Sequence, residues 1–218
     1  MYFLICILFS ISSFFSTYNI ETMNAINYFN NHAVVNKTLE RYLTTENVIR
    51  AKSIVAPEVA MYSMVEDVIE YRTLFLFYIQ FGSADFSIGK FQMKPSFAEE
   101  IEKIVIKKFG AKYRILKIRS KNNKEIRKIR LDRLMNVNWQ CIYLSAFIDI
   151  ASEISKKRHI NKDYEVRYWA TLYNSGINSS HSYIIKSMKK KQFPMSRQFN
   201  YAEVVQEFYD YFKCKSAQ

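Results

Sequence analysis

The chain is poor in the residues that make tight turns: its 218 residues include four glycines and three prolines. This scarcity excludes collagen-like and low-complexity architectures and argues against a barrel or sandwich with many tight turns. Three cysteines without a C-x-x-C pair and three scattered histidines provide no zinc-site spacing, so we expect no metal and no cofactor. Cys141 and Cys214 suit either one disulfide in an oxidising compartment or two buried free thiols.

Positive charge is in excess, with 32 Lys and Arg against 20 Asp and Glu and a net charge of +12. Such a balance favours contact with a polyanion, for example nucleic acid, an anionic membrane or an acidic cell-wall polymer. Thirteen of the cations fall between Lys103 and Arg133, where the acids are Glu125 and Asp132. This basic band predicts either a solvated face of helices or a surface that faces a polyanion.

The N-terminal segment is almost wholly apolar from Tyr2 to Phe15, and the first charged side chain is Glu21. Such a run is too short to span a bilayer comfortably, since a transmembrane helix needs roughly 20 residues, but it suits the apolar region of a secretory signal. We therefore expect residues 1–17 to be a signal peptide and the protein to be exported to the periplasm or the extracellular space. An uncleaved membrane anchor and a buried N-terminal helix are the alternatives, because no Lys or Arg precedes the run.

Apolar spacing predicts a mainly α-helical chain beyond this leader. With 49% hydrophobic and 16% aromatic residues, the chain has material for one well-packed domain. The stretch 65–81 is so densely apolar that we expect it in the centre of the core, ended by Gly82. Residues 84–93 alternate and predict a small hairpin-like extended segment. Other helices are expected over 45–64, 95–110, 137–154, 164–173 and 200–212.

Two of the scarce glycines lie in short motifs rich in polar and aromatic residues. Residues 89–95 read Gly-Lys-Phe-Gln-Met-Lys-Pro, residues 170–176 read Ala-Thr-Leu-Tyr-Asn-Ser-Gly, and residues 200–205 read Asn-Tyr-Ala-Glu-Val-Val. In these motifs and their order the chain resembles the lysozyme-like soluble lytic transglycosylases and goose-type lysozymes, whose patterns are G-L-M-Q-x-x-P, A-x-Y-N-x-G and N-Y-V-x-x-V. The second motif has one extra residue between Ala and Tyr.

The resemblance covers roughly residues 45–212 and implies a mainly α, α+β lysozyme-like fold, and we expect residues 18–218 to form a single catalytic domain. It also implies cleavage of the β-1,4 bond between N-acetylmuramic acid and N-acetylglucosamine in peptidoglycan, with one glutamate as general acid and then base. One carboxyl can suffice, because after protonating the glycosidic oxygen it can take a proton from water or from the sugar's own 6-hydroxyl. The acid must first be protonated, so it needs an apolar site that raises its pKa.

Glu58 is the candidate acid, because it stands in the otherwise apolar helical stretch 54–60. It departs from the family pattern in three ways. Val59 follows it where the family has serine, Pro57 precedes it, and the distance to the glycine of the first motif is 31 residues. Glu70 has the better spacing and is the rival, and Asp85 is a third acid, which could orient a water in an inverting hydrolysis.

By the same resemblance, Ser87, Gln92, Tyr173 and Asn174 are expected to bind the sugar. Three of them also have a plainer interpretation: Ser87 as a turn hydroxyl, Gln92 as a turn cap and Tyr173 as a core ring. These alternatives are left open by the residue types alone.

Trp139 and Trp169 are expected in the core, with stacking on a sugar ring as the alternative. The partners expected are peptidoglycan glycan strands and cell-envelope proteins, without nucleic acid, and the chain is expected to be a monomer. Two other functions stay open. One is a lysozyme-like shell that binds glycan without cleaving it, which the missing serine after Glu58 favours, and the other is a nucleic-acid-binding protein that uses the basic band.

Overall fold

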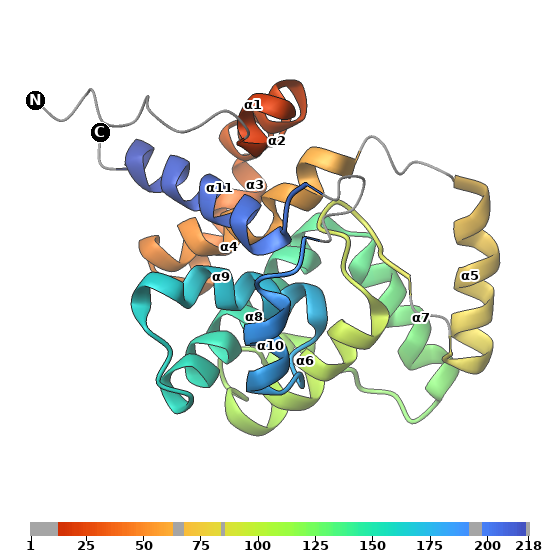
Figure 1. Ribbon diagram of the computed structural model, residues 1–218. Coiled ribbons are helices and arrows are strands. Elements are labelled where there is room, and N and C mark those ends of the chain that lie inside the picture. Colours follow the sequence, from red (N-terminus) through yellow and green to blue (C-terminus); the bar gives the residue numbers. More distant parts are fainter. Residues whose placement is uncertain (1–12, 63–67, 84–85, 192–197, 217–218) are drawn as a thin grey trace, which may run out of the picture.

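The computed structural model describes residues 13–62, 68–83, 86–191 and 198–216, with the backbone alone for 68–72. This part of the chain is mainly helical, as predicted, and its helices pack around a central one (Figure 1). The helices are α1 (Phe14–Thr17), α2 (Asn19–Asn31), α3 (Ala33–Tyr42), α4 (Thr45–Met61), α5 (Val68–Phe81), α6 (Pro95–Lys108), the 3-10 turn η3 (Arg114–Leu116), α7 (Asn123–Leu134), α8 (Val137–Lys157), α9 (Lys162–Ser175), α10 (His181–Ser187) and α11 (Tyr201–Ser216).

The predicted hairpin-like segment is a tight turn closed by one antiparallel bridge, between Ile88 and Met93. Residues 84 and 85, at the start of the predicted segment, lie outside the described residues. The turn leads directly into α6, which begins at Pro95, a favourable first helical residue because its missing N–H has no helical partner to lose. The fold therefore presents the first motif as a short loop between α5 and α6.

α8 forms the centre of the fold because its side chains are buried almost all round between residues 140 and 151. A helix that is apolar on every side must be surrounded by other elements, and α8 contacts α3, α4, α6, α7 and α9. Asn136 caps its start by accepting from the backbone N–H groups of Asn138 and Trp139. α8 thus supplies the wall against which both α4 and the 88–93 turn are positioned.

α4 packs against α2, α9 and α11, and its C-terminal half is buried except for partial exposure at Glu58. Pro57 lies inside this helix, and because proline has no N–H, the Ser53 carbonyl loses its helical partner. Burial of Ile54, Val55 and Val59 around that point leaves Glu58 as the one acid in an apolar stretch.

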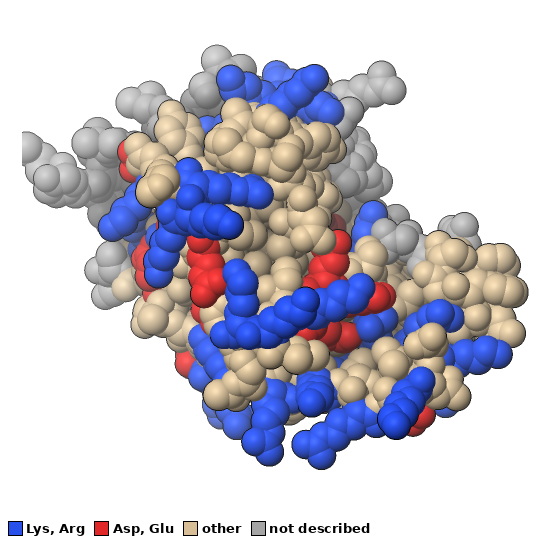
Figure 2. All heavy atoms as spheres, turned by 90° about the horizontal axis from the view of Figure 1, so that it is seen from below, with Lys and Arg blue, Asp and Glu red and all other residues tan. Residues whose placement is uncertain are grey.

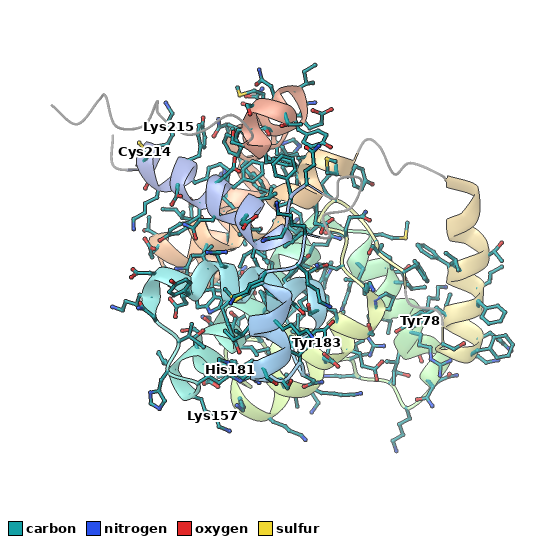
Figure 3. All side chains as sticks on the ribbon, viewed as in Figure 1. Tyr78, Lys157, His181, Tyr183, Cys214 and Lys215 are labelled. Atoms are coloured by element: carbon teal, nitrogen blue, oxygen red, sulfur yellow. The ribbon has the colours of Figure 1, made fainter. Side chains whose placement is uncertain are left out.

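α5 lies at the edge of the molecule, so the prediction that the stretch 65–81 forms the centre of the core is wrong for residues 68–81, and residues 65–67 lie outside the described residues (Figure 1). It packs against α7, where the Arg127 guanidinium donates to the Ile79 carbonyl (3.0 Å) and the Arg130 guanidinium donates to the Tyr78 hydroxyl (2.6 Å). Figure 3 shows Tyr78 on the side of α5 that faces α7. Arginines of the basic band therefore hold this helix in place.

The outer face of α5 keeps large apolar side chains in solvent: Leu76 is 70% exposed, Phe77 52% and Phe81 61%. Apolar density alone therefore predicted the helix but not its burial. An apolar run predicts a helix, but it does not tell whether that helix is covered on every side. The cover depends on neighbours from other parts of the chain.

Residues 13–17, which fall within the predicted leader, belong to the packed body. The Phe14 ring is fully buried, with ring centroids 5.7 Å from Phe199 and 6.2 Å from Phe208. The Glu207 carboxylate accepts from the backbone N–H groups of Phe14 (3.1 Å) and Phe15 (3.3 Å). Cleavage after residue 17 would remove the Phe14 ring from the core. Export of the protein stays a prediction. Among the described residues no helix is long and apolar enough to cross a membrane.

Both described cysteines are free thiols: Cys141 is buried in α8, and Cys214 is exposed near the end of α11 (Figure 3). Of the two expectations for this pair, the disulfide is absent from the structure, and the burial expected for Cys214 is wrong. Desolvation in the core raises the pKa of the Cys141 thiol to about 12, so it stays protonated and unreactive at neutral pH.

Candidate active site

A pocket of about 260 Å³ opens between the C-terminal half of α4, the 88–93 turn with the start of α6, and the end of α9. The residues that line it come from segments far apart in the sequence. They are Glu58, Ser87, Gln92, Met93, Lys94, Ser96, Phe97, Glu100, Tyr173, Asn174, Ser175 and Gly176.

The lining includes the candidate acid Glu58 and the four residues expected to bind sugar, Ser87, Gln92, Tyr173 and Asn174. The two alternative acids are placed differently. Glu70 falls in the first turn of α5, and its side chain lies outside the described residues, as does the whole of Asp85. No described residue of α5 lines this pocket. The roles of the five lining residues stay predictions.

Glu58 has the environment of an acid that can hold its proton near neutral pH. Burial raises the pKa of its carboxyl to about 7, and a hydrogen bond with Tyr201 lowers it in part. Burial acts in this direction because a carboxylate loses its hydration in an apolar surrounding, whereas the neutral acid loses little. At neutral pH the carboxyl therefore exists in both forms, so it can give a proton and take one back.

Two buried tyrosines stand next to Glu58. The Tyr201 hydroxyl donates to the Ile54 carbonyl at 2.8 Å and also interacts with the Glu58 carboxyl. Because a hydroxyl has one hydrogen to share between these acceptors, it offsets only part of the effect of burial. The Tyr173 hydroxyl donates to the Phe91 carbonyl at 2.6 Å. Burial and the nearby Glu58 charge raise the pKa of both tyrosines well above the ordinary value, so both stay neutral.

The 88–93 turn needs glycine at position 89. Gly89 has φ +67°, and a Cβ built on it would lie 2.3 Å from the Gln140 amide nitrogen and 2.6 Å from the Leu134 carbonyl oxygen. The first contact is far below van der Waals distance, and the second is with rigid backbone, so a larger residue would displace the turn. The first motif's glycine is thus required by the close approach of α8 and of the end of α7.

Gln140 is the residue that holds this turn, and the sequence reasoning missed it. It is fully buried on α8, where its amide nitrogen donates to the Ile88 carbonyl (2.7 Å) and its amide oxygen accepts from the Phe91 N–H (3.1 Å). One side chain thereby satisfies the Phe91 N–H and adds a second donor to the Ile88 carbonyl, which also accepts from the Met93 N–H of the bridge. The sequence carries no local signal for this role, because the groups that Gln140 binds lie 49 and 52 residues away.

Gln92 both lines the pocket and closes its own turn, since its amide nitrogen donates to the Gly89 carbonyl at 2.9 Å. Its φ of +48° is uncommon for a residue with a side chain and places it in the left-handed region. Backbone strain of this kind persists where the surroundings hold a side chain in one place. The turn-cap interpretation of Gln92 and its place in the pocket are therefore compatible.

A second carboxylate, Glu100 on α6, lies in the same pocket and was also missed. The Asn178 amide donates to it at 2.7 Å. The sequence did hold a signal for Glu100. α6 follows directly on the turn, and the spacing of Ser96, Phe97 and Glu100 puts them on one face of the first turns of this helix. The pocket thus holds two acids: Glu58, whose pKa burial raises, and Glu100, which accepts from the Asn178 amide.

The tryptophans do not line this pocket. Trp169 is fully buried, and its indole N–H donates to the Ser155 hydroxyl at 2.7 Å, so its ring belongs to the core. Trp139 is half-buried under the Arg133 guanidinium, 4.3 Å from the ring centroid. No cluster of His, Cys, Asp and Glu suited to a metal ion occurs within residues 13–62, 68–83, 86–191 and 198–216.

The basic band is partly structural. Arg130 is buried, and its guanidinium binds the carboxylates of Glu102 (2.7 Å) and Glu99 (3.3 Å), which joins α7 to α6. Ten of the thirteen cations are exposed. Six of the thirteen have protein partners among the described residues, namely Lys103, Lys108, Lys112, Arg127, Arg130 and Arg133. Figure 2, which views the molecule from below Figure 1, shows Lys and Arg spread over this face among acidic side chains.

No family model, curated protein or solved structure matches this chain.

Proposed function

We propose that this chain is a peptidoglycan-cleaving enzyme, a lytic transglycosylase or muramidase that acts on the β-1,4 bond between N-acetylmuramic acid and N-acetylglucosamine. The observation that carries the proposal is Glu58, a carboxyl with a pKa of about 7 in a pocket whose lining is mostly hydroxyl, amide and aromatic side chains, with Lys94 and Glu100 as its other charged residues. Neutral polar groups beside an aromatic ring suit the hydroxyl and N-acetyl groups of a sugar.

In the first step, protonated Glu58 gives its proton to the glycosidic oxygen while the bond from that oxygen to the anomeric carbon breaks. Positive charge develops on the sugar ring, and the Glu58 carboxylate left behind lies in a surrounding of low polarity, where its attraction for that charge is strong. A carboxyl with an ordinary pKa of 4.5 would be almost wholly ionised at pH 7, whereas one of about 7 supplies the acid form in useful amount.

In the second step, the Glu58 carboxylate takes a proton back. If the proton comes from the 6-hydroxyl of the same sugar, that oxygen closes on the anomeric carbon and gives a 1,6-anhydro sugar. If the proton comes from water, hydrolysis gives a reducing end. Glu100 is the other carboxylate in the pocket and is the group that would position this water.

The neighbouring side chains have distinct parts in this proposal. Ser87 and Asn174 bind the sugar, and within the described residues neither side chain makes a hydrogen bond that would compete. Tyr173 is a positioning residue, because its hydroxyl donates to the Phe91 carbonyl and so fixes the turn that carries Gln92. The net charge of +12 favours a polymer that bears lactyl and peptide carboxylates.

The test is digestion of purified sacculi by the wild type and by Glu58→Gln, with mass spectrometry of the released muropeptides. Glu40→Gln is the matched control, since Glu40 is an exposed acid on α3 that does not line the pocket. We expect Glu58→Gln to lose turnover by about 10²-fold or more and Glu40→Gln to keep it. Anhydro-muropeptides identify the transglycosylase and reducing ends the muramidase. Full turnover by Glu58→Gln would remove this residue from the mechanism, and sacculi bound but not cut by the wild type would leave a glycan-binding protein.

A further inference from the structure

A second pocket, of about 350 Å³, lies between α2 and the C-terminal end of α4. Its lining residues are Asn24, Asn27, Tyr28, Asn31, His32, Val59, Ala60 and Lys90. It shares two elements with the first pocket. Val59 directly follows Glu58 on α4, and Lys90 belongs to the same turn as Gln92. The two pockets are therefore built on the same end of α4 and on the same turn.

Three amides line the α2 side of this pocket. Asn24, Asn27 and Asn31 are spaced i, i+3 and i+7, which puts them on one face of the helix, and all three are exposed. Within the described part of the chain their side chains make no hydrogen bond. Each carboxamide offers two donor hydrogens and one acceptor oxygen, so this face presents both kinds of group at regular spacing.

Aromatic rings and one cation complete the pocket. The rings of Tyr28 and His32 are stacked, with centroids 4.0 Å apart. The Lys90 ammonium lies 4.2 Å from the centroid of the Tyr62 ring and 5.4 Å from that of Tyr28. Burial raises the pKa of Tyr28 to about 12, so its hydroxyl stays neutral. The described residues that line the pocket include no acid, so a carboxylate on the ligand meets no repulsion there.

We propose that this second pocket is a glycan subsite for an N-acylated sugar that bears a carboxylate. The asparagines bind its hydroxyl and N-acyl groups, the Tyr28 ring packs against its apolar face, and Lys90 attracts its carboxylate. The inference rests on the proposed function, because it assigns the pocket to the same strand that Glu58 would cut. A phosphate polymer fits poorly, since it needs several cations and α2 has neither Lys nor Arg in a chain with 32 of them.

The test measures binding to full-length Glu58→Gln protein, so that cleavage does not interfere. Two probes are titrated by calorimetry: a peptidoglycan tetrasaccharide that keeps its lactyl carboxylates, and chitotetraose, which has the same N-acetyl groups without carboxylates. The pocket variant is Asn27→Ala with Asn31→Ala. Its matched control is Asn30→Ala, since Asn30 is exposed on the same helix but does not line the pocket. Thermal unfolding of each variant checks that the fold is kept.

We expect the double variant to bind both probes about tenfold more weakly, from the loss of hydrogen bonds to the sugar, and Asn30→Ala to bind like its parent. Lys90→Met keeps the aliphatic stem without the charge and is expected to weaken only the carboxylated probe. Equal affinities for the double variant and Asn30→Ala would overturn the subsite, as would failure of both probes to bind. Equal weakening of both probes by Lys90→Met would overturn the carboxylate assignment. Because catalysis is read separately by sacculus digestion, failure here is distinguishable from failure of Glu58 as the acid.

Discussion

Replacing Glu58 by glutamine is expected to make the protein more stable at alkaline pH. In the native state the Glu58 pKa is about 7 against the ordinary 4.5. This difference corresponds to about 3 kcal/mol at 25 °C, because one pH unit is worth about 1.4 kcal/mol. Glutamine has nearly the same shape and does not ionise, so it removes this contribution while keeping the packing at the end of α4.

The pH dependence has a definite sign. Between pH 4.5 and 7 the native carboxyl keeps a proton that the unfolded chain releases, so the native state binds more protons and its stability falls as pH rises. The contribution is fully present below pH 4.5, is lost as pH rises through about 7, and is absent above it. The stability of Glu58→Gln relative to the wild type is therefore expected to rise by about 3 kcal/mol between pH 4 and pH 8.

Urea denaturation of both proteins at pH 4, 6 and 8 measures this difference, and groups that titrate alike in both proteins cancel. Glu40→Gln, an exposed substitution of the same kind, is expected to show little change with pH relative to the wild type. A difference between Glu58→Gln and the wild type that stays constant from pH 4 to pH 8 would refute the raised pKa.

Three further substitutions test the surroundings of Glu58. Gly89→Ala puts a carbon 2.3 Å from the Gln140 amide at a φ of +67°, so we expect a loss of about 2 to 4 kcal/mol in urea denaturation; unchanged stability would contradict the contact. Gln140→Leu leaves the buried Phe91 N–H without its partner and removes one of the two donors to the Ile88 carbonyl, so we expect sacculus digestion to fall about tenfold or more, and full turnover would show that the turn stands without it. Tyr201→Phe removes a hydrogen bond that lowers the Glu58 pKa, so the pH above which digestion falls is expected to rise, and a shift to lower pH would contradict this role.

Local signals were enough to predict the helices but not their surroundings. Apolar spacing predicted helices close to α4, α6, α8, α9 and α11, because one buried face repeats every three to four residues. The same signal misplaced α5, which is densely apolar yet keeps Leu76, Phe77 and Phe81 exposed. The residues that pack over a helix come from distant segments of the chain. For α5 they include Arg127 and Arg130 of α7, about 50 residues later in the sequence.

The site was predictable only where its residues fell in short motifs. Gln92 and Tyr173 stood in such motifs, and Glu58 was an acid in an apolar run, so each carried a local signal. Gln140 acts through backbone groups 49 and 52 residues away, and a single glutamine in a helix gives no hint of that. Tyr201 was visible in the third motif, but its approach to Glu58 depends on the packing of α11 against α4.

Titration of the Glu58 carboxyl itself tests the central claim most directly. Carbon-13 NMR of glutamate side chains, with the Glu58 signal assigned by its loss in Glu58→Gln, gives the midpoint without reference to activity. A midpoint near pH 7 is the result expected from a carboxyl enclosed by α4, Tyr173 and Tyr201. A midpoint near 4.5 would contradict it, because the acid would then be ionised at neutral pH with no proton to give.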